Sequence, residues 1–172
     1  MKRFVFICLL LAACSHRARV PLDTQLWRLD AEWMTPPEAN VRTAPATILV
    51  FRSSGEFVEV HCQLIEQADQ TVYIRSGAQY IAAVGKWKQD GSKIHATREK
   101  IGERIAVPFG GGVHPLCRHA ELTFDISGNS VSGSAGEKTP GTYAPVTRLV
   151  APDFESYVND AKRSPITCVV PK

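Results

Sequence analysis

The chain lacks the features of a membrane-spanning, nucleic-acid-binding or phosphate-binding protein. After residue 13, no apolar run reaches the roughly 18 residues that a membrane-spanning helix requires. No run of five like charges occurs, so the chain has no basic tract of the kind that binds nucleic acid. Gly110-Gly111-Gly112 is followed neither by Gly-Lys-Ser/Thr nor by a helical pattern, which argues against a phosphate-binding loop.

The motifs of nucleophilic hydrolases are missing as well. Residues 128–132 (GNSVS) lack the second glycine of a Gly-x-Ser-x-Gly elbow and fall in an expected hairpin. Cys62 and His61 cannot form a dyad on a strand, because neighbouring residues face opposite sides. These absences favour a protein that is not an enzyme.

The first residues have the layout of an export signal. Met1-Lys2-Arg3 supplies two positive charges, and Phe4 to Leu11 forms a short apolar run. Ala12-Ala13-Cys14 follows, and then the polar residues 15–17. A charged start, a short apolar segment and small residues before a cleavage site are typical of a secretory signal.

Leu11-Ala12-Ala13-Cys14 also resembles the lipobox of bacterial lipoproteins. The resemblance implies that residues 1–13 are removed and that lipid on Cys14 anchors the protein. Because Ser15 rather than Asp follows the cysteine, the resemblance further implies sorting to the outer membrane. We expect the anchored domain to face the periplasm, with exposure at the cell surface as the alternative. An ordinary secretory signal with a chance cysteine is the alternative.

Removal of the signal changes the charge balance. The full chain has 20 Lys+Arg and 17 Asp+Glu, and Lys2 and Arg3 leave with the signal, so the mature chain would carry 18 basic and 17 acidic side chains. This balance gives no reason to expect a nucleic-acid partner. We expect a tether over residues 14–25 and a single β-rich domain over residues 26–172.

Three cysteines remain in the expected domain, and an oxidising periplasm would allow one disulfide among them. Cys62 shares its parity with Val58, Val60 and Leu64, so we expect a buried free thiol. Cys117 lies off the apolar face of the following strand. Cys168 lies near the chain end, where a crosslink opposes fraying. We therefore expect a disulfide between Cys117 and Cys168.

Period-two alternation between turn residues predicts a mainly β protein. The expected strands cover residues 27–33, 48–51, 57–65, 71–75, 80–88, 93–98, 118–126, 131–134, 143–150 and 166–170. Residues 35–45 contain three prolines and are expected to form a loop. Short strands at even spacing indicate a small antiparallel β-barrel or sandwich.

One short C-terminal helix is also expected. Its apolar residues are Phe154, Tyr157, Val158 and Ala161, at i, i+3, i+4 and i+7. Asp153 is placed to cap the start of this helix, and the following proline would end it.

Two segments, 51–57 (FRSSGEF) and 85–94 (GKWKQDGSKI), resemble the Gly-x-Trp hairpins of small envelope lipoprotein barrels. Examples are the META-type domains and the N-terminal domain of the copper-linked, surface-sensing lipoprotein NlpE. The resemblance covers only these segments and implies a barrel fold. The Cys-x-x-Cys pair of the NlpE domain is absent, so neither its metal role nor its redox role carries over.

The densest group of potential metal ligands is His114, Cys117 and His119. On an extended chain Cys117 and His119 would point the same way, and imidazole with thiolate suits copper or zinc. His61 and His95 could complete such a site. Structural metal sites usually show two tight ligand pairs, whereas only one loose pair is present. We therefore favour an oxidised Cys117 with solvated histidines, and we expect no cofactor.

The tryptophans are the remaining candidates for a site. Trp27 and Trp33 share the parity of the first expected strand's apolar face, and Trp87 shares that of Ile81. We expect all three in the core, because side chains can fill a barrel of about eight strands. An aromatic-lined ligand pocket is the functional alternative.

The leading hypothesis is a non-enzymatic envelope lipoprotein whose β-barrel binds a small apolar ligand or a partner protein. The first alternative is a periplasmic lipoprotein that handles or senses a metal through His114, Cys117 and His119. The second alternative, an enzyme acting on envelope polymers, has no supporting motif.

Overall fold

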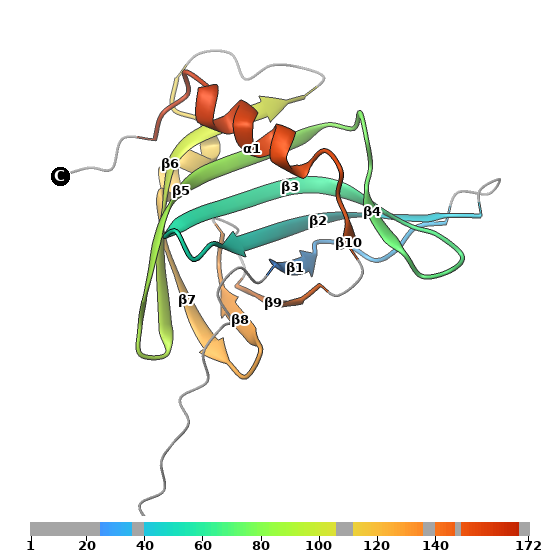
Figure 1. The fold of residues 1–172 in the computed structure, drawn as a ribbon, viewed down its shortest axis with the longest axis horizontal. Helices are drawn as coiled ribbons and strands as arrows, with labels where there is room; N and C mark the ends of the chain where they lie inside the picture. Colours follow the sequence, from blue (N-terminus) through green and yellow to red (C-terminus); the bar gives the residue numbers. More distant parts are fainter. Residues whose placement is uncertain (1–24, 36–39, 106–111, 136–139, 147–148, 169–172) are drawn as a thin grey trace, which may run out of the picture.

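The computed structural model describes residues 25–35, 40–105, 112–135, 140–146 and 149–168. The strands are β1 (Gln25–Leu29), β2 (Arg42–Phe51), β3 (Glu56–Glu66), β4 (Val72–Ile74), β5 (Tyr80–Asp90), β6 (Lys93–Arg104), β7 (Glu121–Ser127), β8 (Ser130–Gly133), β9 (Gly141–Pro145) and β10 (Leu149–Val150) (Figure 1). The helices are the 3-10 helix η1 (Pro115–His119) and the α-helix α1 (Phe154–Arg163). None of the helices in these ranges is long and apolar enough to cross a membrane.

Eight strands close into a barrel. Around the ring, β1, β2, β3, β5, β6, β7, β8 and β9 each pair antiparallel with the next, and β9 returns to β1. Strand β3 has two neighbours on one edge, because residues 56–61 pair with β5 and residues 64–66 pair with β4. Strand β10 extends β4 outside the ring in parallel. The expected antiparallel barrel with one short α-helix is confirmed.

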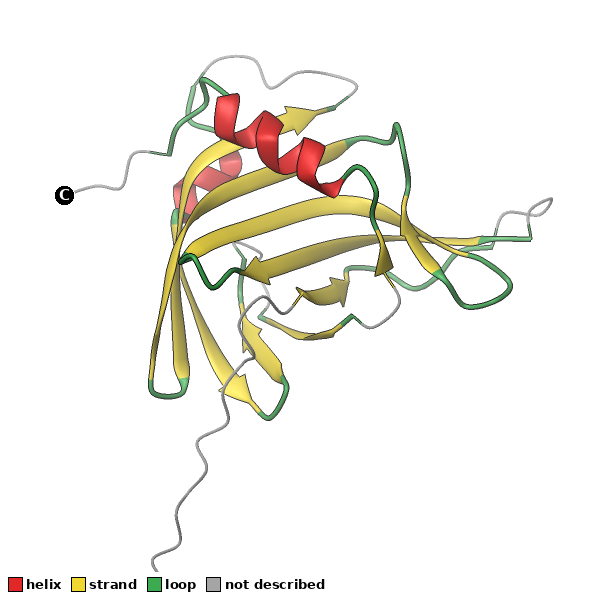
Figure 2. Cartoon of the chain, in the orientation of Figure 1, coloured by secondary structure: helices red, strands yellow, loops and turns green. Residues whose placement is uncertain are grey.

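Strands β2, β3 and β5 are buried on both faces. Helix α1 lies across the outer face of β5 and β6 (Figure 2), and its apolar side joins one cluster with even-numbered residues of β2, β3 and β5. The outer cluster includes Ile48, Val50, Val58, Val60, Cys62, Leu64, Tyr80, Ala82, Phe154, Tyr157, Val158 and Ala161. Odd-numbered residues of the same strands face the barrel interior, since alternate side chains point to opposite faces.

Apolar side chains fill one part of the interior. This inner cluster contains Leu26, Leu49, Phe51, Phe57, Ile94, Ala96, Leu122, Phe124, Val131, Ala135 and Tyr143. The ring of Phe51 stacks on that of Phe57 at 5.6 Å and meets the ring of Phe124 edge-on at 6.1 Å. The barrel is therefore packed here and leaves no room for a ligand.

Glycines allow two close approaches in this architecture. A Cβ atom at Gly85 would lie 1.7 Å from the carbonyl oxygen of Thr97, at the point where the β5–β6 register shifts. A Cβ atom at Gly102 would lie 2.6 Å from the backbone nitrogen of Ala161, so this glycine lets α1 sit directly on β6. Gly85 is the glycine of the Gly-x-Trp hairpin, and its role is steric.

The expected boundaries were wrong in the N-terminal part. The strand expected over residues 27–33 ends at Leu29, and Met34 instead forms a separate bridge to Thr43. The loop expected over residues 35–45 contains the start of β2 at Arg42. Strand β2 tolerates Pro45 because this residue lies beyond the last β1–β2 pair, near a sheet edge.

The C-terminal part also differs from expectation. The strand expected over residues 118–126 is β7 preceded by η1, and the strand expected over 143–150 divides into β9 and β10. Of the strand expected over 166–170, Thr167 forms an isolated bridge to Lys100, and residues 169–170 lie outside the described ranges. Asp153 stands at the N-cap of α1 without a capping hydrogen bond, and its carboxylate instead accepts from Ser76 Oγ at 2.8 Å.

Candidate functional site

A fully buried ion pair crosses the middle of the barrel. Glu59 on β3 and Arg98 on β6 both have 0% exposed side chains. Arg98 Nε donates to Glu59 Oε2 at 2.6 Å, and Arg98 Nη2 donates to Oε1 at 2.7 Å. This is the bidentate geometry that gives arginine and carboxylate their strongest hydrogen bonds.

The rest of the Arg98 guanidinium is also hydrogen-bonded. Its Nη1 donates to the carbonyl of Leu116 at 3.1 Å and to that of His119 at 2.9 Å, and its Nη2 donates to the carbonyl of Ala135. The first two carbonyls belong to η1, so Arg98 holds this short helix against the barrel. A buried charge requires such complete pairing to be tolerated.

The hydrogen bonds continue from Glu59 toward one mouth of the barrel. The Nε2 atom of His61 lies 2.6 Å from Glu59 Oε1, and its Nδ1 atom lies 3.1 Å from Thr47 Oγ1. Thr47 in turn donates its hydroxyl to Asp30 Oδ2 at 3.1 Å. We call Asp30, Thr47, His61, Glu59 and Arg98 the charge chain.

The directions of these bonds define the state of His61. A threonine hydroxyl has one proton, and Thr47 gives that proton to Asp30. Its oxygen can then only accept from His61 Nδ1, while an ionised Glu59 can only accept from Nε2. Both ring nitrogens therefore carry a proton, and His61 is an imidazolium ion.

Electrostatics agree with this assignment. Burial alone would raise the pKa of Glu59, but Arg98 and His61 outweigh burial and lower this pKa from 4.5 to about 2. Burial alone would lower the pKa of His61, but the charge and hydrogen bond of Glu59 outweigh it and raise the pKa above 6.5. The charge chain therefore contains two carboxylates, those of Asp30 and Glu59, and two cations, the Arg98 guanidinium and the His61 imidazolium.

A cavity of about 780 Å³ opens at the mouth next to His61. We call it the mouth pocket; its lining residues are Met34, Pro45, His61, Cys62, Gln63, Arg75, Ser76, Gly77, Ala78, Gln79, Tyr80, Ile81 and Ile105. It lies where β3 leaves β5 to pair with β4, so the loop from β4 to β5 forms its rim. The barrel is hollow at this end and packed at the inner cluster.

No family model, curated protein or solved structure matches the chain.

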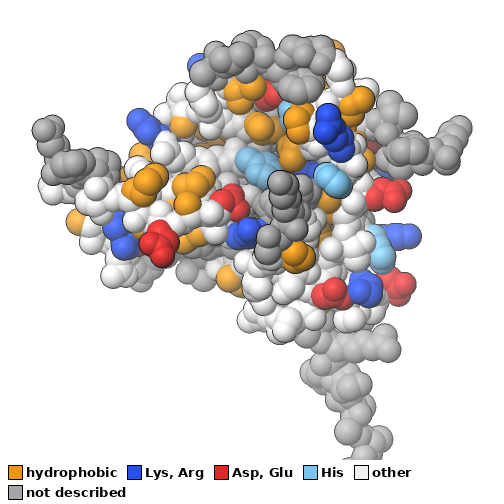
Figure 3. All heavy atoms as spheres, turned by 180° about the vertical axis from the view of Figure 1, so that it is seen from behind, with side chains coloured by type: hydrophobic (Ala, Val, Ile, Leu, Met, Phe, Trp, Pro, Cys, Tyr) orange, Lys and Arg blue, Asp and Glu red, His pale blue; other side chains and the backbone are white. Residues whose placement is uncertain are grey.

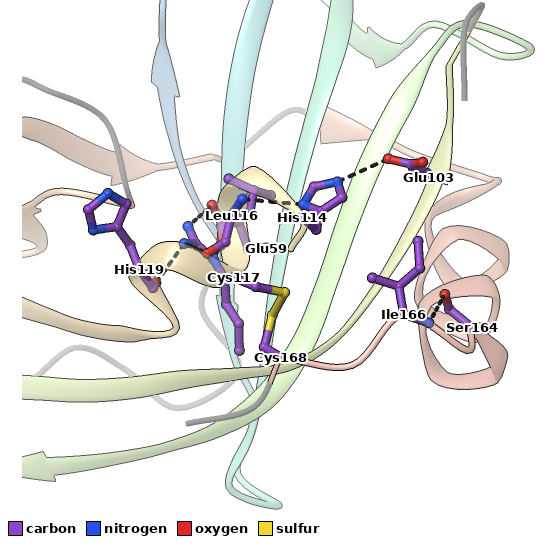
Figure 4. The surroundings of a disulfide bond; sticks show 10 residues. Glu59, Glu103, His114, Leu116, Cys117, His119, Ser164, Ile166 and Cys168 are labelled. Carbon is purple, nitrogen blue, oxygen red and sulfur yellow. Dashed lines mark hydrogen bonds and ion pairs between the residues drawn. A yellow bond between two sulfur atoms is a disulfide. The ribbon is translucent and has the colours of Figure 1, made fainter. Parts of the chain in front are cut away.

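The expected metal ligands are engaged in other interactions. Cys117 forms a disulfide with Cys168, as the sequence favoured. His114 is 4% exposed, accepts from the backbone nitrogen of Leu116 and lies 3.0 Å from Glu103, so it caps η1. In Figure 4 the ring of His119 points away from that of His114.

Within the described ranges, no three His, Cys, Asp or Glu side chains form a group that could hold a metal ion. His61 belongs to the charge chain, and His95 lies on β6 with its Nδ1 3.5 Å from Thr123 Oγ1. The structure therefore does not assemble the ligand set His114, Cys117 and His119.

Neither Trp33 nor Trp87 lines the mouth pocket. Trp87 packs on Phe51 with ring centroids 5.4 Å apart and donates Nε1 to the carbonyl of Arg52 at 2.8 Å. Trp33 packs on the outer cluster beneath the guanidinium of Arg42, 5.6 Å from the ring centroid. The side chain of Trp27 lies outside the described part of the chain.

Sequence reasoning missed Glu59 and Arg98 and saw His61 only as a possible metal ligand. The available signal was Phe57, an aromatic residue that shares its parity with Glu59 and His61 on the face taken to be polar. A large aromatic there indicates that the second face is buried as well.

Proposed function

We propose that the protein is a lipid-anchored envelope barrel that binds a small molecule with an apolar body in its mouth pocket. The pocket carries this proposal, because its volume of about 780 Å³ lies within the ~300–1,000 Å³ that small-molecule sites occupy. Pro45, Ala78, Ile81 and Ile105 supply apolar contacts, and a few polar groups converge beside them. The lipid anchor rests on the lipobox resemblance at Cys14.

The described residues on the face of the molecule in Figure 3 form no surface suited to a highly charged macromolecule, which favours a small-molecule ligand. On the face shown in Figure 3, acidic and basic side chains are scattered among hydrophobic ones without a large patch of one sign. The exposed large hydrophobic residues of the described ranges are Met34, Val113 and Val150, which lie on separate segments. Of these three, Met34 lines the mouth pocket.

The chemistry of the pocket favours binding over catalysis. Burial raises the pKa of the Cys62 thiol to about 12, so this thiol is protonated and a poor nucleophile. The Ser76 hydroxyl donates to the carboxylate of Asp153. Both ring nitrogens of His61 are engaged within the charge chain, so this histidine has no lone pair with which to accept a proton from a ligand.

Photo-crosslinking of the full chain in its membrane tests this proposal. A neutral eight-carbon alcohol that carries a diazirine should label the peptides containing Ala78 or Pro45. Ala78→Trp should fill the pocket and abolish this labelling, whereas Asn129→Trp, in the exposed β7–β8 turn, should leave it unchanged. Thermal unfolding would verify that both variants fold. Labelling elsewhere, or labelling that survives in a folded Ala78→Trp variant, would overturn the proposal.

A further inference from the structure

We infer that the ligand of the mouth pocket carries one anionic group, of the carboxylate type, and that Arg75 binds it. This inference rests on the proposed function and adds the chemical class of the ligand.

The charges that line the pocket support an anionic ligand. Among the lining residues that the structure describes, Arg75 and His61 are the two cationic ones and none is acidic. Glu59 lies 2.6 Å from His61 and compensates its charge. Arg75, by contrast, forms no ion pair with any residue in the described ranges. One uncompensated positive charge therefore remains at the rim, where a cationic ligand would be repelled.

The guanidinium of Arg75 is held at the pocket wall by a neutral partner. The backbone nitrogen of Arg75 donates to the carbonyl of Gln63 at 2.9 Å, and Nη1 donates to Gln63 Oε1 at 2.7 Å. Gln63 lies two residues beyond His61 on β3 and therefore faces the same side of the strand. An amide positions the guanidinium without neutralising it, and the other N–H groups of the planar fork suit a carboxylate.

The placement of these groups also orients the ligand. Arg75 is exposed at the rim, whereas Ile81 pairs with His61 deeper on the β3–β5 ladder. An anionic head group would stay partly hydrated beside Arg75, and its apolar body would lie along Ile81 and Ile105. This arrangement avoids burial of an unpaired charge, which would be strongly unfavourable.

Octanoate and 1-octanol provide a matched pair of probes, because they share chain length and differ in charge at pH 7. Binding would be measured by calorimetry on the full chain in lipid nanodiscs, with empty nanodiscs subtracted. Octanoate should bind about tenfold or more tightly than 1-octanol, as expected for a charge-assisted hydrogen bond.

Two substitutions complete the test. Arg75→Gln should weaken octanoate binding to the level of 1-octanol and leave 1-octanol binding unchanged. Arg118→Gln, an exposed arginine outside the pocket, should change neither affinity. Equal binding of the two probes, or no selective loss in Arg75→Gln, would overturn the anionic ligand while leaving the pocket function intact. Binding of neither probe would overturn both.

Discussion

Replacing Glu59 by Gln should strongly destabilise the protein. The substitution preserves side-chain shape but leaves the Arg98 guanidinium fully buried without a counter-charge. Loss of one partner of a buried ion pair costs about 3–5 kcal/mol. The pKa of Glu59 supports this magnitude, because a shift from 4.5 to about 2 corresponds to roughly 3 kcal/mol of stabilisation of the ionised form.

Thermal unfolding of the full chain in mild detergent, followed by circular dichroism, measures this effect. For a protein of this size each kcal/mol lowers Tm by about 2–4 °C, so Glu59→Gln should lower Tm by roughly 6–20 °C. Glu99→Gln is the matched control: Glu99 pairs with Lys86 at 3.4 Å, with side chains 49% and 78% exposed. An exposed pair of this kind contributes less than about 1 kcal/mol.

The same variant should change the response to acid. A carboxyl whose pKa is lowered by folding contributes stability above its unfolded pKa and loses that contribution as pH falls through the folded value. The wild-type protein should therefore lose the Glu59 contribution between pH 4.5 and about 2. Glu59→Gln has no carboxyl group at this position, so its stability should not show this part of the acid-induced decrease. A Tm within about 2 °C of wild type at pH 7, or an unchanged acid profile, would refute the assigned role of the pair.

Three further predictions concern the anchor, the disulfide and helix α1. Cys14→Ser should move the protein from the membrane fraction to the soluble fraction or leave the precursor uncut, and firm membrane association of this variant would contradict the lipid anchor. Reduction of the Cys117–Cys168 disulfide should cost on the order of 2–4 kcal/mol in denaturant unfolding, and a different pairing in non-reducing peptide maps would contradict it. Gly102→Ala should destabilise by about 1–3 kcal/mol, because its Cβ would meet the backbone of Ala161. Unchanged stability would show that α1 is not seated there.

Local patterns predicted the fold class because they act over short distances. The alternation in Val58–Leu64 identified one buried face of β3, and the spacing of Phe154, Tyr157 and Ala161 identified the apolar side of α1. The tight turn at Gly91 joins β5 and β6 with a positive φ of 57°, as its Asp-Gly sequence indicated. Each of these features depends on residues only a few positions apart.

The charge chain could not be predicted in this way. Glu59 and Arg98 are 39 residues apart on strands separated by β5, so only the curvature of the sheet brings their side chains together. Thr47 and Asp30 are 17 residues apart and meet through the pairing of β1 with β2. On β3 alone, Glu59 and His61 are indistinguishable from polar residues on a solvated face. Arg98 sits among alternating charges that suggest an exposed strand. Phe57 on the same face indicates that this face is buried, but no local feature of the sequence pairs Glu59 with Arg98.

The metal hypothesis assumed an extended chain between His114 and His119. The segment is instead a 3-10 helix, because Pro115 suits the first helical position and the His114 side chain caps the turn. In a helical turn Cys117 and His119 no longer point the same way, and Cys117 instead meets Cys168. A proline beside a potential ligand pair was the signal against strand geometry.

The buried ion pair contributes more to the form of the pocket than to the net stability of the barrel. Removing two charges from water costs several kcal/mol per ion, and even an excellent bidentate contact does little more than offset that cost. Its structural effect is larger, because Glu59 also holds the ring of His61, and Arg98 holds the carbonyls of η1. The charge of His61 is thereby compensated from within the barrel. Because Glu59 compensates the charge of His61, this histidine gives little preference for an anionic ligand in the mouth pocket. Arg75 is then the residue that distinguishes anionic from neutral ligands.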